Sequence, residues 1–589
     1  MDNIVGFMDK IVALIFISLL SCSSSQFEES HEIANQVKMK VESISNENWR
    51  VTYSLPEKVL GVYFYRQTNQ FRKKEWRVLD TDLVIEHYEN SEIIYSKTKK
   101  KFNEIIVEFA PYYKTTPKDY EFFQPFSDGG ILFYTGHLLL QPMLKKTNSD
   151  DGINLNFNEH MPWTNMATLK PIKNGSIVVN GKINQGTLKW HDKNNKGTYV
   201  YFGNIKPLET EAFVAILDSG LPPWVIVKMR EFLPKLFSVY SKGTQQKLSF
   251  KPVVYFNYKP TERIGTGYSG GTLPGLVQLT IEGTDWRKEN NTNLKQIVKF
   301  LGHESAHFWN GQMFNNIESK AAWVHEGGAD AFSYRALYKL GIINKKELWE
   351  NYNNALSSCL MNLDGKALNS SEKSRSFRNY YDCGSTIMLM VESALLTKYG
   401  ENSLFEFWEE LLGVARKQNN QYDSSTFHSV LRDKFSQQKL SNMIKVLEGE
   451  DRESFLSLFK QMGSLVNLKV KNNNKNAPAY FLSKLNQRFF NTLMQKDCGG
   501  KVATSLSGKG IIVFGNKKCN AFKQKYDVIS IEGVKLTQKT GNKGLLFAKK
   551  ACKKKGKVRL GLYRSSKFLF VPCKENDVRL NNWFEFIKN

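Results

Sequence analysis

The sequence has no apolar run after residue 22 that is long enough to span a bilayer, which requires roughly twenty residues. None of its seven cysteines follows the spacing of a zinc knuckle, and no nucleic-acid-binding motif accompanies its basic clusters. These absences argue against a later membrane span, against a zinc site built from cysteines and against nucleic acid as a partner.

Acidic residues are in the minority, with 57 Asp and Glu against 82 Lys and Arg, so the formal net charge is +25. The densest lysine clusters lie at residues 97–101 and 549–557. Such clusters are most often solvated loops, and contact with an anionic surface is the alternative. A chain of 589 residues with 41% hydrophobic and 13% aromatic residues is typical of a globular protein of about three or four domains.

The N-terminus has the features of an export signal. Ile11–Leu20 is an unbroken run of apolar or small residues after Lys10, too short for a membrane span but typical of a signal-peptide core. Leu19-Leu20-Ser21-Cys22 resembles the lipobox of bacterial lipoproteins, in which the cysteine becomes the lipidated first residue. We therefore expect an exported lipoprotein anchored at Cys22 in the cell envelope, at the outer membrane facing the periplasm or the surface. An ordinary cleaved signal with an incidental cysteine is the alternative.

The other cysteines are even in number, which in an exported chain indicates disulfides. They are Cys359, Cys383, Cys498, Cys519, Cys552 and Cys573. The first two form a natural local pair. The last four allow two further bridges whose connectivity the sequence leaves open.

Residues 23–215 alternate in the manner of β-strands, for example in Trp49–Leu55 and Glu104–Phe109. Polar turns such as Ser127–Gly130 separate the strand patterns. This part contains no catalytic constellation, and we expect a β-sandwich-like domain that shapes or positions a substrate.

Residues 216–468 have a mixed pattern, with a helical period over Val225–Tyr240 and strands at Val253–Phe256 and Leu276–Ile281. Later helical patterns follow at Ser385–Tyr399, Leu404–Arg416, Phe427–Phe435 and from Leu440 to about Val466. Residues 469–589 return to short strands with a helix-like insert. Asp527–Val534 looks like the core strand of a PDZ domain. The expected architecture is multidomain α+β, with a signal peptide (1–22), an N-terminal β-rich domain (23–215), an α/β lobe followed by an α lobe (216–468), and a small β-rich, PDZ-like domain (469–589).

Two histidines and a glutamate carry the strongest chemical signal in the chain. His303 and His307 are four residues apart, so both imidazoles lie on one face of a helix expected at about Asn293–Trp309. Glu326, on a second helix expected at Ala321–Leu340, adds a carboxylate. Two histidines and a carboxylate, with a fourth position open to water, form the ligand set of a catalytic rather than a structural zinc. We therefore predict one zinc ion per chain.

Glu304 lies between the two histidines and is displaced around the helix, where it is placed to act on a zinc-bound water rather than to bind the metal. Two surface histidines on a solvated helix would be the simpler explanation. It is disfavoured because Ile297, Val298 and Leu301 make the helix largely buried, and buried neutral histidines need partners that a metal supplies.

The motif resembles the gluzincin metallopeptidases, in particular the aminopeptidase N and glycyl aminopeptidase families. His303–Gly311 is similar to their H-E-x-x-H followed by an aromatic and a small residue, and Trp323–Gly327 to their stretch with the glutamate ligand. Tyr380–Gly384 is similar to the tyrosine-x-x-glycine that opens a helix. The resemblance implies a thermolysin-like catalytic domain and a transition-state tyrosine at Tyr381, with the adjacent Tyr380 as the alternative. The order of domains favours the glycyl aminopeptidase arrangement.

One departure from these families concerns the substrate. Their members have an upstream glycine-rich strand whose glutamate holds the substrate's free amino group. The matching stretch here is Gly270-Gly271-Thr272, and Thr272 stands close to the position of that glutamate. A protonated amino terminus therefore loses its partner, and exopeptidase and endopeptidase action both stay open. The strand can still pair with a substrate backbone.

The expected reaction is hydrolysis of peptide bonds in a peptide or protein substrate. Zinc would lower the pKa of its bound water, Glu304 would accept that water's proton and pass it to the leaving amine, and by resemblance the Tyr381 hydroxyl would stabilise the oxyanion. Asp330 lies one turn beyond Glu326 and is expected either to orient a zinc-binding histidine or to be a surface carboxylate.

A different class of protein is the alternative, namely a catalytically silent surface lipoprotein that uses the zinc fold as a scaffold for a partner. The presence of Glu304 argues against this alternative, because a purely structural site has no use for a base.

Overall fold

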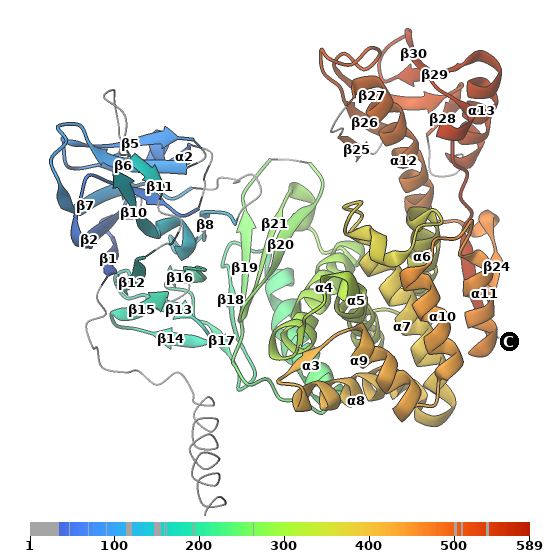
Figure 1. The fold of residues 1–589 in the computed structure, drawn as a ribbon, viewed down its shortest axis with the longest axis horizontal. Helices are drawn as coiled ribbons and strands as arrows, with labels where there is room; N and C mark the ends of the chain where they lie inside the picture. Colours follow the sequence, from blue (N-terminus) through green and yellow to red (C-terminus); the bar gives the residue numbers. More distant parts are fainter. Residues whose placement is uncertain are drawn as a thin grey trace, which may run out of the picture. The chain divides into compact units, whose positions relative to one another are not determined.

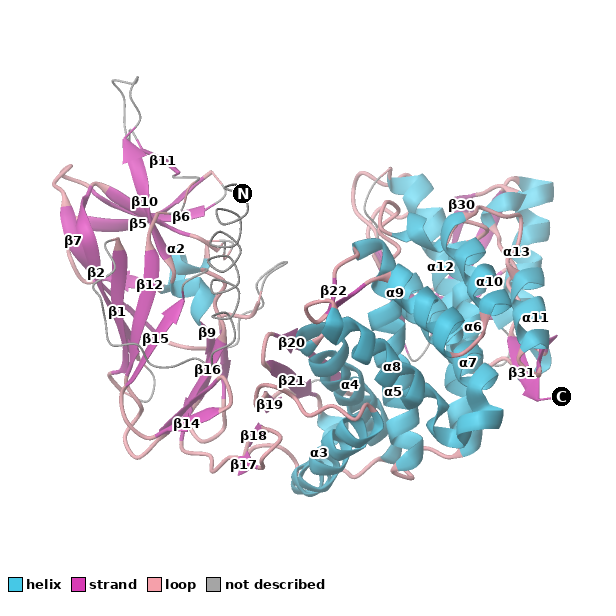
Figure 2. Cartoon of the chain, turned by 60° about the horizontal axis from the view of Figure 1, so that its bottom comes forward, coloured by secondary structure: helices cyan, strands magenta, loops and turns pink. Residues whose placement is uncertain are grey.

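The computed structural model describes residues 35–589 apart from gaps at 46–47, 67, 69, 90, 113–119, 146–154, 158–159, 161, 193–194, 263, 500–502, 508–509, 537–540 and 589. The signal segment and Cys22 lie outside these residues. The chain forms two compact units. The first comprises the chain up to Pro125 with Gly129–Val178 and Ile183–Asn204, and the second comprises Phe126–Asp128, Val179–Lys182 and the chain from Ile205 onward. Strands dominate the first unit and helices the second (Figures 1 and 2).

Three sheets build the first unit. The first sheet has the order β15 (Leu188–Asp192), β12 (Thr164–Leu169), β1 (Gln36–Ser43), β2 (Trp49–Val59), β7 (Phe102–Phe109), β4 (Arg77–Val78). The second has the order β11 (Leu155–Phe157), β10 (Leu140–Lys145), β3 (Gly61–Phe64), β6 (Ser91–Ser96), β5 (Leu83–Tyr88). The third has the order β14 (Lys182–Asn184), β13 (Ser176–Val179), β16 (Tyr199–Gly203), β9 (Ile131–Tyr134), β8 (Phe123–Pro125).

The alternation in the sequence explains these strands. In β2, Trp49, Val51 and Tyr53 are buried and the residues between them are half-buried, which is the two-residue period of a strand with one face on a core. The short helix α2 (Phe71–Glu75) accompanies the sheets. The prediction of a β-rich N-terminal part is confirmed.

Another five-stranded sheet supports the α/β lobe of the second unit. Its order is β17 (Leu208–Glu209), β18 (Val214–Leu217), β19 (Val253–Lys259), β21 (Leu276–Glu282), β20 (Gly267–Leu273). The strands β18, β19 and β21 are parallel and almost wholly buried, whereas β20 is antiparallel to β21 and forms an exposed edge. The helix α3 (Pro223–Gly243), with proline in its first turn, links β18 to β19.

Helices form most of the second unit up to residue 465. They are α4 (Asn291–His307), α5 (Ala322–Lys339), α6 (Lys345–Leu363), α7 (Arg378–Tyr399), α8 (Ser403–Lys417), α9 (Ser424–Ser429), α10 (Gln438–Gly449) and α11 (Leu456–Leu465). Their apolar faces share one hydrophobic core with α3 and the sheet. No helix in the described part of the chain is long and apolar enough to cross a membrane.

Two helices lie where the sequence pattern did not predict them, and a third begins earlier than expected. Helix α6 is rich in Asn and Ser, which favour helices weakly, but a capping box of Asn344 and Glu347 starts it and a buried face holds it. Helix α12 (Ala479–Cys498) lies in a tail that was expected to contain short strands, and it buries Phe481, Leu485 and Phe489. Helix α7 begins at Arg378 rather than near Ser385.

The C-terminal part is bracketed by two strands that pair with each other. β24 (Leu468–Asn472) is antiparallel to β31 (Phe584–Lys588). The Asn353 and Ser357 side chains of α6 accept hydrogen bonds from the backbone N–H groups of Phe586 and Phe584, both at 2.9 Å. Between the two strands lie α12, α13 (Gly541–Lys555) and a sheet in the order β25 (Thr504–Ser507), β26 (Gly510–Phe514), β27 (Lys525–Ile531), β29 (Lys557–Leu562), β30 (Phe568–Pro572), with β28 (Val534–Lys535) beside β27.

The six cysteines that were expected to form disulfides are joined in three bridges. Cys359 pairs with Cys383, as expected, and joins α6 to the first turns of α7. The connectivity that the sequence left open is Cys498–Cys519 and Cys552–Cys573. Both of these bridges lie in the core of the C-terminal sheet region.

Helices α5 and α7 touch backbone to backbone at a pair of glycines. A Cβ atom added to Gly327 would collide with the backbone of Gly384, and one added to Gly384 would collide with the carbonyl of Trp323 and the Cα of Gly327. Only glycine permits this separation of the two helices. Glu326 is next to Gly327 in α5, and Tyr381 lies about one turn before Gly384 in α7. The contact therefore also sets the distance between the side chains of Glu326 and Tyr381.

We predict that Gly384→Ala lowers the thermal unfolding temperature, because helix backbones must separate and overpacking of this kind costs about 1–3 kcal/mol or more. The matched control is Gly413→Ala in α8, where an added Cβ meets no atom within 4 Å. That substitution should raise stability by about 0.5–1 kcal/mol through helix propensity. Differential scanning calorimetry of the two variants measures both effects, and equal behaviour of the two would contradict the close contact.

Candidate metal centre

Helix α4 carries both histidines, and its start is fixed by a cap. The Asn290 side chain accepts hydrogen bonds from the backbone N–H groups of Thr292 (2.8 Å) and Asn293 (3.2 Å). Ile297 and Leu301 are fully buried and orient the helix. His303 and His307 therefore leave the same side of α4 one turn apart.

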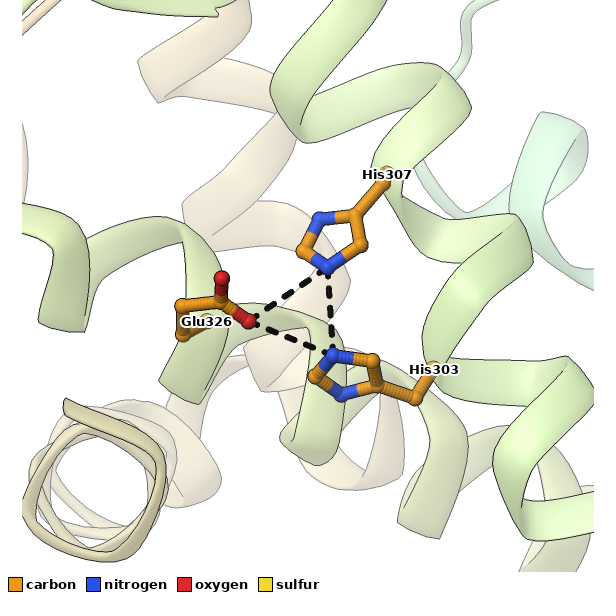
Figure 3. Close-up of side chains that lie close together, drawn as sticks. All are labelled: His303, His307 and Glu326. Atoms are coloured by element: carbon orange, nitrogen blue, oxygen red, sulfur yellow. Dashed lines mark hydrogen bonds and ion pairs between the residues drawn. The ribbon is translucent and has the colours of Figure 1, made fainter. Parts of the chain in front are cut away.

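Helix α5 supplies the carboxylate, and its first turn is anchored from another helix. The Trp323 indole N–H donates to Glu448 of α10 over 3.0 Å, and the other carboxylate oxygen of Glu448 lies 2.7 Å from Nε2 of His428. This buried network and the Gly327 contact hold the start of α5 on both sides. Glu326 consequently faces the two histidines (Figure 3).

Three donor atoms form a nearly regular triangle. The two Nε2 atoms of His303 and His307 lie 3.1 Å apart, and Oε2 of Glu326 lies 3.3 Å from the first and 3.4 Å from the second. Figure 3 shows these three atoms turned toward one another. All three side chains are mostly buried, with exposed fractions between 10% and 19%.

The triangle fits a zinc ion. Ligands of a tetrahedral zinc at about 2.0–2.1 Å from the ion lie about 3.3 Å from one another, which matches the three separations. Glu326 Oε2 is buried and makes no hydrogen bond within the described residues. The chemistry of the donor set, two imidazoles and a carboxylate, is also that of zinc sites.

The electrostatics of the site call for a positive charge. Burial would raise the pKa of Glu326, but the imidazoles of His303, His307 and His325 hold it well below its usual range. Burial would lower the pKa of His303, but the carboxylates of Asp330 and Glu326 outweigh it and raise that pKa to about 10. Burial lowers the pKa of His307. The centre thus stabilises a cation, which a bound metal would supply in place of a proton.

Each histidine is held from its far side. Nδ1 of His303 lies 3.0 Å from Oδ1 of Asp330, and Nδ1 of His307 lies 3.2 Å from Oδ1 of Asn310. When each Nδ1–H donates to its oxygen, each Nε2 keeps its lone pair for the centre of the triangle. The structure therefore places Asp330 against His303, as one of the two sequence interpretations requires.

Asn310 is a site residue that the sequence analysis missed. It lies in the π-helical turn η3 (Phe308–Met313) that directly follows α4, a local geometry no spacing rule predicts. Its side-chain amide N–H donates to the backbone carbonyl of His325 over 2.8 Å, and its backbone carbonyl accepts a hydrogen bond from the Tyr422 hydroxyl. These bonds fix the amide so that its oxygen faces His307.

Glu304 is in hydrogen-bonding contact with β20, the edge strand of the sheet. The Thr272 hydroxyl of β20 lies within hydrogen-bonding distance of both the Glu304 carboxylate and its backbone carbonyl oxygen, at 3.0 Å from the latter. With one proton, it donates to one of these oxygens at a time. Gly270 is exposed and Gly271 half-buried in the same strand, so the expected substrate strand does lie beside Glu304.

Gln312 of η3 holds the C-terminal end of β20 by two hydrogen bonds. Its amide N–H donates to the carbonyl of Leu273 over 2.9 Å, and its oxygen accepts from the N–H of Gly275 over 2.7 Å. The turn that carries Asn310 thus also positions the strand that carries Thr272. Neither role was visible in the sequence, because both depend on the π-helical turn.

Tyr381 rather than Tyr380 faces the centre. The Tyr381 ring stacks on the His303 ring, with centroids 5.4 Å apart and an interplanar angle of 22°. Burial and the nearby Glu326 charge raise its pKa far above the usual range, so its hydroxyl stays protonated and able to donate. Tyr380 is buried on the other side of α7 next to Phe377.

His325 is a further neighbour of the site, with its Nε2 3.3 Å from Oε1 of Glu326.

Comparisons with known proteins identify a fold but no sequence family. No family model matches the sequence, and no curated protein matches it either. Among solved structures, an aminopeptidase N family protein from Idiomarina loihiensis matches 94% of this chain and 98% of its own, with a TM-score of 0.55 and 11% identity. The chain therefore has the multidomain α+β fold of that protein.

Two further structures are similar over smaller parts. An M1 zinc metallopeptidase from Deinococcus radiodurans aligns over 71% of this chain and 94% of its own at 12% identity, with a TM-score of 0.37. Leukotriene A4 hydrolase from Saccharomyces cerevisiae aligns over 80% of this chain and 73% of its own at 11% identity, with a TM-score of 0.38.

We predict that Asn310→Ala and Asp330→Ala each weaken zinc binding by about 10- to 100-fold, because each removes the acceptor that orients a histidine. Competition with a chromophoric chelator measures the dissociation constant. Asn442→Ala, at an exposed position on α10, is the control and should leave zinc binding unchanged. Unaltered zinc affinity in both test variants would show that these contacts do not orient the histidines.

Proposed function

We propose that this protein is a zinc-dependent peptidase that hydrolyses peptide bonds. The observation that carries the proposal is the triangle of His303, His307 and Glu326 with Glu304 beside it. The fold shared with the Idiomarina protein supports the same conclusion. A purely structural zinc site would be closed by a fourth protein ligand, whereas only three converge among the described residues.

The roles of the side chains follow from their positions. Zinc, when bound, would supply a Lewis acid that activates water and polarises the scissile carbonyl. Glu304 would take the proton of the attacking water and deliver it to the leaving amine. The protonated Tyr381 hydroxyl, stacked against His303, would donate to the carbonyl oxygen as negative charge develops on it. The exposed edge of β20 would pair with the backbone of an extended substrate.

The proposal also covers the cellular location of the enzyme, its lipid anchor and the type of its C-terminal domain. The lipobox-like sequence at Cys22 supports export and lipid anchoring in the cell envelope. The three disulfides support an oxidising compartment. The C-terminal region, with its antiparallel sheet and the helices α12 and α13, has the strand and helix content of a PDZ-like domain and is proposed as one.

The decisive experiment combines metal analysis with hydrolysis of a mixed peptide library by the wild-type protein and by Glu304→Gln. We expect about one zinc per chain in both proteins and cleavage by the wild type. Loss of the general base should reduce cleavage by roughly 100-fold or more. The cleavage products separate exopeptidase from endopeptidase action. Zinc binding without cleavage by either protein would instead favour the scaffold role.

Thr272 offers a second test of the catalytic arrangement. We predict that Thr272→Val lowers kcat by about tenfold, because it removes a hydrogen bond to a charged group while keeping the side-chain shape. Thr272→Ser retains the hydroxyl and should restore kcat. Steady-state kinetics, with zinc content and unfolding temperature measured in parallel, distinguish this effect from loss of structure. A serine variant as slow as the valine variant would rule out the hydroxyl as the cause.

A further inference from the structure

A polar pocket lies next to the metal centre, at the start of the helix that carries Tyr381, and none of the three zinc-site residues lines it. Its volume is about 600 Å³, and it is open to solvent between the end of α6, the beginning of α7 and α12. The residues that line it include Arg378, Asn379, Asp382, Lys484, Gln487 and Arg488. Among the residues that line it, Met361 is the apolar exception, so the pocket is built for a charged or hydrogen-bonding group.

The pocket has an excess of positive charge. Arg378 lies 3.2 Å from Asp382, so these two charges offset each other. Arg488 donates to the carbonyl of Met361 and lies 3.5 Å from Asp364. Lys484 makes no hydrogen bond or ion pair with any described residue, and burial lowers its pKa. Its ammonium lies 6.0 Å from the centre of the Tyr480 ring, but no carboxylate of the described residues lies within ion-pair distance of it, so the ammonium favours an anion in the pocket.

Two other features point the same way. The pocket lies at the N-terminal end of α7, a helix of 22 residues, where the helix dipole favours negative charge. The side chain of Asn379 lines the pocket and is only 3% exposed, and its Oδ1 has no hydrogen-bond partner in the described structure. Its Nδ2 donates to the Ser371 hydroxyl over 2.9 Å. Turning the amide by 180° would present its N–H donors to an anion.

The Tyr381 ring lies close both to a residue that lines the pocket and to a histidine of the proposed zinc site. The guanidinium carbon of Arg378 lies 5.2 Å from the centre of the Tyr381 ring, whose other neighbour is the His303 ring at 5.4 Å. An extended peptide spans this distance with roughly three residues. A group held in the pocket can therefore belong to the same substrate molecule whose peptide bond lies at the metal.

We propose that this pocket binds a carboxylate of the substrate, a few residues from the bond that is cleaved. The carboxylate belongs either to an acidic side chain or to the C-terminus of a short peptide, since both present the same anion. The proposal rests on the proposed peptidase function for its biological meaning. The C-terminal region, through Lys484 and Arg488 of α12, then takes part in substrate selection.

The test measures binding rather than cleavage, in the Glu304→Gln protein loaded with zinc. Three hexapeptides of otherwise identical sequence carry a fluorophore on one side chain: one with an internal Glu and an amidated C-terminus, one with Gln in its place, and one with Gln and a free C-terminal carboxylate. Fluorescence anisotropy gives each dissociation constant. We expect the Glu peptide, the free-carboxylate peptide or both to bind about tenfold more tightly than the neutral peptide.

The preference should disappear with Lys484→Gln, return with Lys484→Arg, and persist with Lys471→Gln, which removes an exposed lysine of β24. Which of the two anionic peptides is preferred identifies the source of the carboxylate. Equal binding of the three peptides, or a preference that survives Lys484→Gln, would overturn the proposal. In either case, cleavage of the peptide library by the wild type would leave the proposed peptidase function standing.

Discussion

The contact between Gly327 of α5 and Gly384 of α7 is the constraint on which the rest of the site depends. Without a Cβ on either residue, the two helix backbones meet directly. Glu326 and Tyr381 are attached to these two helices next to the contact, so their separation is set by backbone packing rather than by flexible side chains. The disulfide between Cys359 and Cys383 and the indole bond from Trp323 to Glu448 hold the same two helix ends. A metal centre that depends on rigid ligand placement is thereby supported from three directions.

Charge is the second organising principle. Burial would lower the pKa of His303, but the carboxylates of Asp330, Glu326 and Glu304 outweigh it, so this imidazole favours a positive charge. A zinc ion would supply this charge and satisfy the buried oxygen of Glu326. Beyond Tyr381 the sign reverses, because Arg378, Lys484 and Arg488 outnumber Asp382. A substrate that extends from the metal toward α12 would therefore pass from an anionic to a cationic environment.

Much of the catalytic region could be predicted because its determinants are local. The four-residue spacing of His303 and His307, the apolar residues before them and the Asn290 cap are properties of one helix, and the helix formed as expected. Helices α6 and α12 escaped prediction because their helicity depends on a capping box and on burial that the local composition does not reveal. The start of α7 was placed too late, because the helix already includes Tyr381 and Gly384, and Gly384 is its point of contact with α5.

The sequence by itself determined the donor types and their spacing, and it pointed to Glu304 as the proposed base, because helix periodicity turns a spacing of four residues into a shared face. It also determined which cysteines were available for disulfides. Only the tertiary structure decided that Tyr381 rather than Tyr380 faces the centre, that Asn310 orients His307 from a π-helical turn, and that Thr272 touches Glu304. Each of these contacts joins segments that are brought together by packing or by an irregular turn. Packing between distant segments and irregular turns leave no periodic pattern in the sequence from which the contact could be predicted.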